Sequence, residues 1–223
     1  MPLIEDIAHV FAPPHPAGRP FILGGLVAVM LGLALGPWLA WLGLLFTLFC
    51  LFFFRDPERV PPGRPGAVLA PGDGRVVAIA AAVPPAELGL GLMPRWRIST
   101  FLSVLNVHVN RIPADGTITR IAYRHGGFLN ASLDKASETN ERNAIALRLS
   151  DGREIAVVQI AGLIARRIVC DVREGDAVRA GQRFGIIRFG SRADLYLPEG
   201  VRPLVAVGQT MVGGETVIAE LAS

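Results

Sequence analysis

The chain has 223 residues, of which 51% are hydrophobic and 18% charged, with a formal net charge of +3. This composition excludes an intrinsically disordered chain, which combines low hydrophobicity with high net charge. Two cysteines are too few for a disulfide-stapled scaffold. All but one of the 22 basic residues are arginine. A reaction that needs a lysine amine therefore has a single candidate, Lys135.

Residues 20–54 contain no charged side chain and predict a membrane element. Pro37 stands near the middle of this block, and proline disfavours a straight helix through it. An unbroken helix of this length would run to roughly 52 Å, against about 30 Å for the hydrocarbon core. We therefore predict a helical hairpin that either spans the bilayer twice or dips into one leaflet. A signal peptide fits poorly, because Glu5 and Asp6 precede the block and no small-residue cleavage site follows it.

The block divides the chain into an N-terminal segment (1–19), the hydrophobic hairpin (20–54) and a β-rich domain (55–223). Three arginines follow the block directly: Arg55, Arg59 and Arg64. By the positive-inside tendency, they predict a cell-membrane protein whose larger domain lies on the cytoplasmic side.

Beyond residue 60 the chain consists of short Val, Ile and Leu runs separated by Gly, Pro and Asp, which is typical of β-strands. The clearest runs are Gly74–Ala82, Arg97–Leu102, Gly116–Tyr123, Ala144–Leu149, Glu154–Ala161 and Arg166–Asp171. Asn130–Ser137 is the one internal helix candidate. The predicted fold class is mainly β, a barrel or sandwich behind an N-terminal hydrophobic helical hairpin.

Two glycine-rich stretches suggest tight turns in this domain. Residues 172–185 place Gly-Asp and Ala-Gly pairs between short strands and look like the hairpins of lipoyl-type hybrid barrels. Residues 70–77 have a similar pattern. A lipoyl or biotin carrier needs a lysine at the hairpin tip, and none stands there, so the carrier function is excluded.

Candidate polar residues begin with His108. Strand alternation would place Asn106, His108 and Asn110 on one face. Such a stripe beside Arg111 is unusual for a core strand, although a single histidine is more often structural than catalytic.

Other polar residues have ordinary interpretations when each is taken by itself. Asp73, between two glycines, is typical of a turn, and a catalytic carboxylate on the same loop stays open. Residues 140–143 (Asn-Glu-Arg-Asn) predict a solvated loop before a strand. The sequence has no metal-ligand spacing, phosphate loop or dinucleotide fingerprint, and no nucleic-acid partner is expected. The excess of arginine suits an anionic phospholipid surface.

The pair Gly190-Ser191 has a specific chemical potential, although most Gly-Ser pairs only mark a turn. Glycine tolerates a strained backbone. The hydroxyl of Ser191 can then attack the carbonyl of Gly190 and convert the amide to an ester.

Taken in order, these motifs resemble the phosphatidylserine decarboxylase family in its short bacterial and archaeal-like form. The matching segments are 54–57 (Phe-Arg-Asp-Pro), 70–74 (Ala-Pro-Gly-Asp-Gly), 106–111 (Asn-Val-His-Val-Asn-Arg), 140–143 and 189–191 (Phe-Gly-Ser). The resemblance implies self-cleavage between Gly190 and Ser191. The products would be a larger β chain (1–190) and a small α chain (191–223).

The resemblance also implies the cofactor and the roles of individual residues. Ser191 would pass through an ester and a dehydroalanine to a pyruvoyl group, which forms a Schiff base with the substrate amine. Asp73 matches the family's aspartate in the self-processing relay, and His108 matches its active-site histidine. Longer members carry a second histidine where this chain has Arg111. Which residue activates Ser191 is therefore open between His108 serving both steps and Asp73 acting through water.

The implied activity is decarboxylation of phosphatidylserine to phosphatidylethanolamine and CO2 at the membrane. This reaction belongs to phospholipid biosynthesis, and the enzyme would be made as a zymogen. Candidate substrate contacts are Asn110, Arg111 and Arg142. The expected partners are the phospholipid substrate, the membrane and the two chains of one precursor, with the oligomeric state left open. Two alternatives remain: a decarboxylase of archaetidylserine or another serine lipid, and a non-enzymatic, membrane-anchored lipoyl-like β module with an intact Gly190–Ser191 bond.

Overall fold

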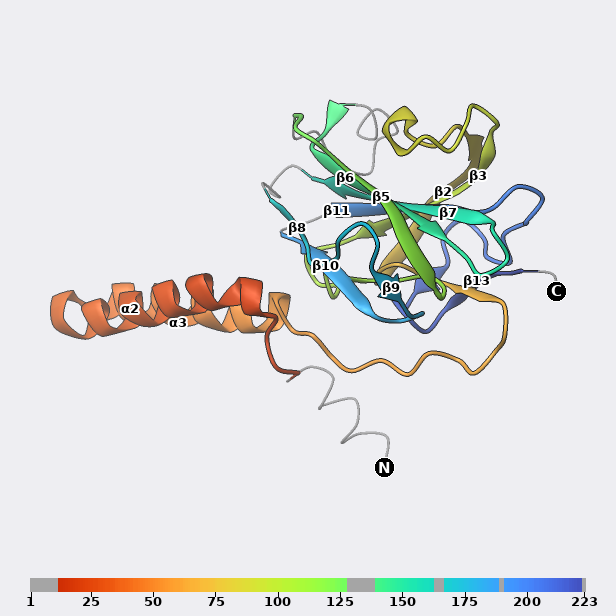
Figure 1. Cartoon of the computed structure of the whole chain (residues 1–223). Helices are drawn as coiled ribbons and strands as arrows, with labels where there is room; N and C mark the ends of the chain where they lie inside the picture. The colour runs from red at the N-terminus through yellow and green to blue at the C-terminus, as the bar shows by residue number, and fades with distance from the viewer. Residues whose placement is uncertain (1–11, 128–138, 163–166, 189–190, 222–223) are drawn as a thin grey trace. The chain divides into compact units, whose positions relative to one another are not determined.

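The computed structural model describes residues 12–127, 139–162, 167–188 and 191–221 (Figure 1). The chain falls into two compact units, residues 1–58 and 59–223.

The first unit is a pair of apolar helices, α2 (Arg19–Leu35) and α3 (Pro37–Phe53), preceded by the short 3-10 helix η1 (Pro16–Gly18). Gly36 joins the two helices with φ 156° and ψ 141°. The segment Pro16–Leu35 is 20 residues long with mean hydropathy 1.8, enough to cross a membrane, whereas α3 is shorter. This architecture confirms the predicted helical hairpin.

Glycines let the two helices approach closely. A Cβ atom on Gly32 would lie 2.0 Å from the backbone nitrogen of Ala40, and one on Gly43 would lie 2.6 Å from that of Val29. The large apolar side chains point outward instead, with Leu33 73% exposed. Small residues inside and large ones outside are typical of helices that pack within lipid, where the apolar surface needs no cover.

The second unit is built from thirteen described strands (Figure 1). They are β1 (Ala67–Leu69), β2 (Gly74–Ala82), β3 (Arg95–Leu102), β4 (Val109–Arg111), β5 (Gly116–Arg124), β6 (Arg142–Arg148), β7 (Glu154–Ala161), β8 (Ile168–Cys170), β9 (Ala177–Val178), β10 (Arg183–Ile187), β11 (Ser191–Tyr196), β12 (Thr210–Met211) and β13 (Val217–Glu220). A 3-10 helix, η2 (Ala86–Leu88), lies between β2 and β3.

These strands form three antiparallel sheets. The largest has eight strands in the order β12-β2-β3-β11-β7-β6-β5-β9, and it curls into a half-barrel (Figure 1). The second has the order β4-β10-β8, and the third pairs β1 with β13. The main core brings together apolar side chains from strands of all three sheets, such as Leu195, Phe184 and Ile218. The mainly β prediction is therefore confirmed.

All six predicted strand runs overlap an observed strand. Gly74–Ala82 and Glu154–Ala161 match β2 and β7 at both ends. The helix candidate Asn130–Ser137 lies outside the described residues, as does Lys135.

Two predictions about strand arrangement were wrong. Residues 172–185 make the expected turns, with Gly175 and Gly181 at φ 92° and 78°, but they do not form a hairpin of their own. Strand β9 has only two residues and pairs with β5, while β10 pairs with β4 and β8. The expected strand face from Asn106 to Asn110 also fails, because Asn106 closes a turn with Ser103 and β4 begins at Val109.

Candidate active site

Ser191 is the first residue of β11, the strand that lies between β3 and β7. Its register partners are Leu102 and Ala161. The residue is 0% exposed, and its Oγ has no hydrogen-bond partner among the described residues. Burying a hydroxyl without a partner costs about 1–3 kcal/mol, so such a group in a native fold calls for an explanation. A hydroxyl that acts as a nucleophile would provide one.

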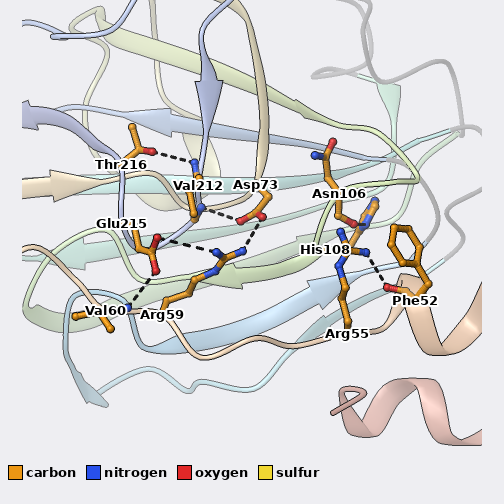
Figure 2. Close-up of polar contacts among 11 residues, drawn as sticks. Phe52, Arg55, Arg59, Val60, Asp73, Asn106, His108, Val212, Glu215 and Thr216 are labelled. Atoms are coloured by element: carbon orange, nitrogen blue, oxygen red, sulfur yellow. Dashed lines mark hydrogen bonds and ion pairs between the residues drawn. The ribbon is translucent and has the colours of Figure 1, made fainter. Parts of the chain in front are cut away.

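His108 is held in the connection between β3 and β4, directly before β4. It is 0% exposed, and its Nδ1 lies 3.0 Å from the carbonyl oxygen of Asn106 (Figure 2). A carbonyl only accepts hydrogen bonds, so Nδ1 carries the proton and Nε2 is the basic nitrogen of the neutral ring. The turn that positions this carbonyl is closed by Asn106 Oδ1, which accepts from the Ser103 amide at 2.9 Å and its hydroxyl at 2.7 Å.

The backbone of His108 is also tied to the strand that leads toward the predicted cleavage site. The amide of Ile187, the last residue of β10, donates to the His108 carbonyl at 3.3 Å. Gly190 itself lies outside the described residues. The hydrogen bond therefore brings the histidine segment beside the end of β10, and Ile187 comes three residues before Gly190 in the chain.

Asp73 sits in the loop before β2 with both carboxylate oxygens engaged (Figure 2). Its Oδ2 accepts from Arg59 at 2.8 Å, and its Oδ1 accepts from the Gly213 amide at 2.8 Å. The ion pair is largely buried, since the two side chains are 11% and 15% exposed. The same loop contacts β4, because the Arg111 amide donates to the Pro71 carbonyl at 2.8 Å. The fold thus brings the Asp73 loop and the segment that follows His108 together.

The three candidate substrate contacts have different surroundings. Asn110 is 0% exposed and accepts from Gln159 Nε2 at 2.7 Å. Arg111 Nη1 donates to the Gly181 carbonyl at 3.0 Å. Arg142 is ion-paired with Glu87. A substrate role for each of them stays a prediction.

Residues 140–143 are not the solvated loop that their polarity predicts. All four are buried, at 1%, 7%, 8% and 1% exposure in chain order, and the last two begin β6. Asn140 Nδ2 donates to the carbonyl of Ala161, the residue paired with Ser191, at 2.7 Å. Glu141 accepts from the Tyr123 hydroxyl. Burial and this hydrogen bond raise the pKa of Tyr123 to about 12. The polar side chains of this segment form hydrogen bonds with groups inside the fold instead of with water. The number of polar residues in the segment does not reveal such partners.

Sequence reasoning also missed charged residues on either side of the predicted cleavage site. Arg192 makes two hydrogen bonds to Asp194, at 2.6 and 2.7 Å, and both side chains are 1% exposed. On the other side, burial and the neighbouring charge of Arg167 lower the pKa of Arg188. The Arg188 amide also donates to the Arg167 carbonyl at 3.3 Å, so two arginines meet here, and their positive charge suits a phosphate. The Arg-x-Asp pattern, which places two opposite charges on one face of a strand, was the available signal for the first pair.

Within the described ranges, no group of three or more His, Cys, Asp or Glu side chains is arranged to hold a metal ion.

Comparison with known proteins identifies the family. A family model described as phosphatidylserine decarboxylase matches residues 46–219. The chain belongs to this family. It is 71% identical over 221 residues to a phosphatidylserine decarboxylase proenzyme of Granulibacter bethesdensis, covering 99% of this chain and 91% of the relative. Proenzymes of the same name from Gluconacetobacter diazotrophicus and Gluconobacter oxydans are 64% and 62% identical, each over 99% of this chain and 100% of the relative.

Proposed function

We propose that the chain is a phosphatidylserine decarboxylase proenzyme that cleaves itself and then converts phosphatidylserine to phosphatidylethanolamine and CO2. The observation that carries this proposal is Ser191 Oγ, which is fully buried and has no described hydrogen-bond partner in a member of this family. The Asp73 loop is hydrogen-bonded to Arg111 of β4, and the His108 carbonyl accepts from the amide of Ile187, four residues before Ser191. Relatives with the same name match nearly the whole chain.

Self-cleavage begins at the hydroxyl of Ser191. Its Oγ loses a proton to a base and bonds to the carbonyl carbon of residue 190, after which the C–N bond breaks and the nitrogen is protonated. The Cα proton of Ser191 is then removed, the Oγ–Cβ bond breaks, and Oγ leaves within the new carboxylate of the larger chain. Tautomerisation and attack by water release ammonia and leave a ketone at the start of the smaller chain.

His108 is the base that this geometry favours. Its Nδ1 is committed to the Asn106 carbonyl, so Nε2 is the nitrogen that can take the proton from Ser191. Asp73 is held by Arg59 and by the Gly213 amide, and its contribution is to fix the loop that packs on β4. This assignment favours His108 for both steps over Asp73 acting through water.

The resulting pyruvoyl group would supply an electrophilic ketone for the substrate amine and an electron sink for the loss of CO2. The chain's own residues provide the surroundings. Ser191 is buried at the start of β11, so the reacting atoms lie away from bulk solvent. Arg188 and Arg167 provide positive charge for the phosphate of the lipid.

The helical hairpin would anchor the enzyme in the membrane that contains its substrate. Its exposed surface carries large apolar side chains, among them Met30, Trp38 and Trp41 at 66%, 67% and 65% exposure. The arginines that follow the hairpin, including Arg55 and Arg59, favour a cytoplasmic position for the catalytic domain. A phospholipid and the two chains of one precursor are then the partners.

Denaturing electrophoresis tests the self-cleavage. The wild type should give two chains, 1–190 and 191–223. Ser191→Ala should give one chain near 23.8 kDa that releases no CO2 from phosphatidylserine vesicles. Ser99→Ala is a matched control, because Ser99 is also 0% exposed with an unpartnered Oγ, on β3.

This control should cleave like the wild type. An intact wild-type chain with decarboxylase activity would refute the mechanism. A cleaved wild type that releases no CO2 from phosphatidylserine would refute the assigned substrate.

A further inference from the structure

Three buried amide side chains form a hydrogen-bonded row, here called the amide row. Asn143 Nδ2 donates to Gln159 Oε1 at 2.9 Å, and Gln159 Nε2 donates to Asn110 Oδ1 at 2.7 Å. The residues come from β6, β7 and β4, and none is more than 1% exposed. The row therefore links the eight-stranded sheet to the three-stranded one.

The direction of the amide row is fixed from its far end. The thiol of Cys170 donates to the Val172 carbonyl at 3.7 Å, and Asn143 acts on the sulfur as a donor, an interaction that by itself lowers the pKa of this thiol. Asn143 is therefore oriented as a donor, and Gln159 must accept with its oxygen and donate with its nitrogen. It follows that Asn110 accepts with Oδ1 and presents its NH2 group at the other end.

This terminal NH2 group has no described hydrogen-bond partner, although it is buried. Gly72 lies against it, since a Cβ there would be 2.9 Å from Asn110 Nδ2 and 3.3 Å from Leu102 Cδ2. Leu102 is a register partner of Ser191, and Gln159 is a partner of the residue two further along β11. Because side chains alternate along a strand, Ser191 and Gln159 project from the same face of the sheet. Asn110 thus lies over the first residues of β11.

We propose that Asn110 Nδ2 is the hydrogen-bond donor that stabilises negative charge on Ser191 Oγ during self-cleavage, with Gln159 and Asn143 as positioning residues. The inference rests on the proposed self-cleavage. Both atoms are buried and lack described partners, so they are not bonded to each other in the precursor. Catalytic hydrogen bonds commonly tighten only as the reaction proceeds.

Ser191 Oγ gains negative charge at two points of the reaction. The first is its deprotonation and attack on the carbonyl of residue 190, and the second is its departure within the carboxylate when the Oγ–Cβ bond breaks. A donor fixed beside Oγ lowers the barrier to both. The amide keeps its own protons throughout, so Asn110 needs no partner for proton exchange.

The first test replaces the donor. Asn110→Leu has a similar volume and no N–H group, and the rate of chain cleavage would be followed by electrophoresis after cell-free synthesis of the full chain into phospholipid vesicles. We expect cleavage on the order of 10²-fold slower than in the wild type. Thr100→Val is the matched control, because Thr100 Oγ1 is likewise buried without a partner on the neighbouring strand. It should cleave at the wild-type rate.

The second test reverses the amide row from its far end. A carboxylate in Asn143→Asp can only accept, so Gln159 would turn its nitrogen toward residue 143, and Asn110 would turn its oxygen toward Ser191. Asn143→Leu removes the first link without imposing the reversed order. We expect Asn143→Asp to cleave about tenfold or more slower than Asn143→Leu. If the amide row only stabilised the fold, the two variants should cleave at equal rates when their thermal stabilities are equal. The melting temperature of each variant is therefore measured beside its cleavage rate.

The outcomes separate the two proposals. An uncleaved wild type would overturn the proposed function itself. A cleaving wild type with an equally fast Asn110→Leu would overturn only the role of Asn110. Should Asn110→Leu fail to fold, the Asn143 pair decides, and equal cleavage in both variants would refute the amide row.

Discussion

The buried pair of Arg192 and Asp194 gives a quantitative prediction. Asp194→Asn keeps the shape of the side chain but removes its charge, which leaves the guanidinium of Arg192 buried opposite a neutral amide. Both side chains are 1% exposed and joined by two short hydrogen bonds, so the solvent cannot compensate. Removing one partner of such a pair costs about 3–5 kcal/mol of unfolding free energy. At about 2–4 °C per kcal/mol, the melting temperature should fall by roughly 6–20 °C.

The assay is thermal unfolding in detergent, with Ser191→Ala present in every variant so that each protein remains one chain. Glu220→Gln is the control, because Glu220 pairs with Arg64 at the surface, where such a pair contributes about 0–1 kcal/mol. The double variant Arg192→Met with Asp194→Leu should lose less unfolding free energy than the two single changes combined, since it removes both charges of the pair together. A fall of less than about 2 °C in Asp194→Asn would refute the reasoning.

Two further predictions concern the helical hairpin and the tyrosines. Gly32→Ala should lower the thermal stability of the detergent-solubilised protein, because its Cβ would meet the Ala40 backbone at 2.0 Å. Gly24→Ala is the control and should leave the stability unchanged, because nothing lies within 4 Å of its Cβ. Equal stabilities of the two variants would contradict the observed helix packing. Burial raises the pKa of both tyrosines, and the hydrogen bond to Glu141 helps to raise that of Tyr123 to about 12. The phenolate absorbance at about pH 11 should therefore be small in the folded protein and large in denaturant. Their contribution to stability is present below about pH 10 and is lost as pH rises through the raised pKa values; full phenolate absorbance in the folded protein at about pH 10 would contradict this.

The sequence was sufficient for features that depend on local pattern. The strands β2 and β7 could be predicted at both ends because apolar runs bounded by turn residues have few other interpretations. The helical hairpin followed from a long uncharged block interrupted by Pro37. Gly190-Ser191 and His108 became candidates through short motifs in a family-like order, a signal that does not require knowledge of strand pairing.

The rest depends on pairing between distant segments. The burial of residues 140–143 was missed, because the carbonyl of Ala161 and the side chain of Gln159 become their partners only when β6 lies beside β7. For the same reason the amide row is invisible in sequence, where its three members are widely separated. The strand face expected for Asn106 was wrong because a local turn with Ser103 competes successfully with extension of the strand.

The position of β11 has a consequence for how the mature protein is assembled. The proposed cut creates a new chain end in the interior of the eight-stranded sheet, with β3 and β7 on either side. The described strands that follow the cut pair only with strands that precede it: β11 with β3 and β7, β12 with β2, and β13 with β1. Cleavage would thus turn one polypeptide into an interlocked heterodimer whose interface is the domain core. Once denatured, the two pieces would have to find each other by a concentration-dependent encounter. The chain therefore has to fold before it is cleaved, and cleavage would make maturation a one-way step.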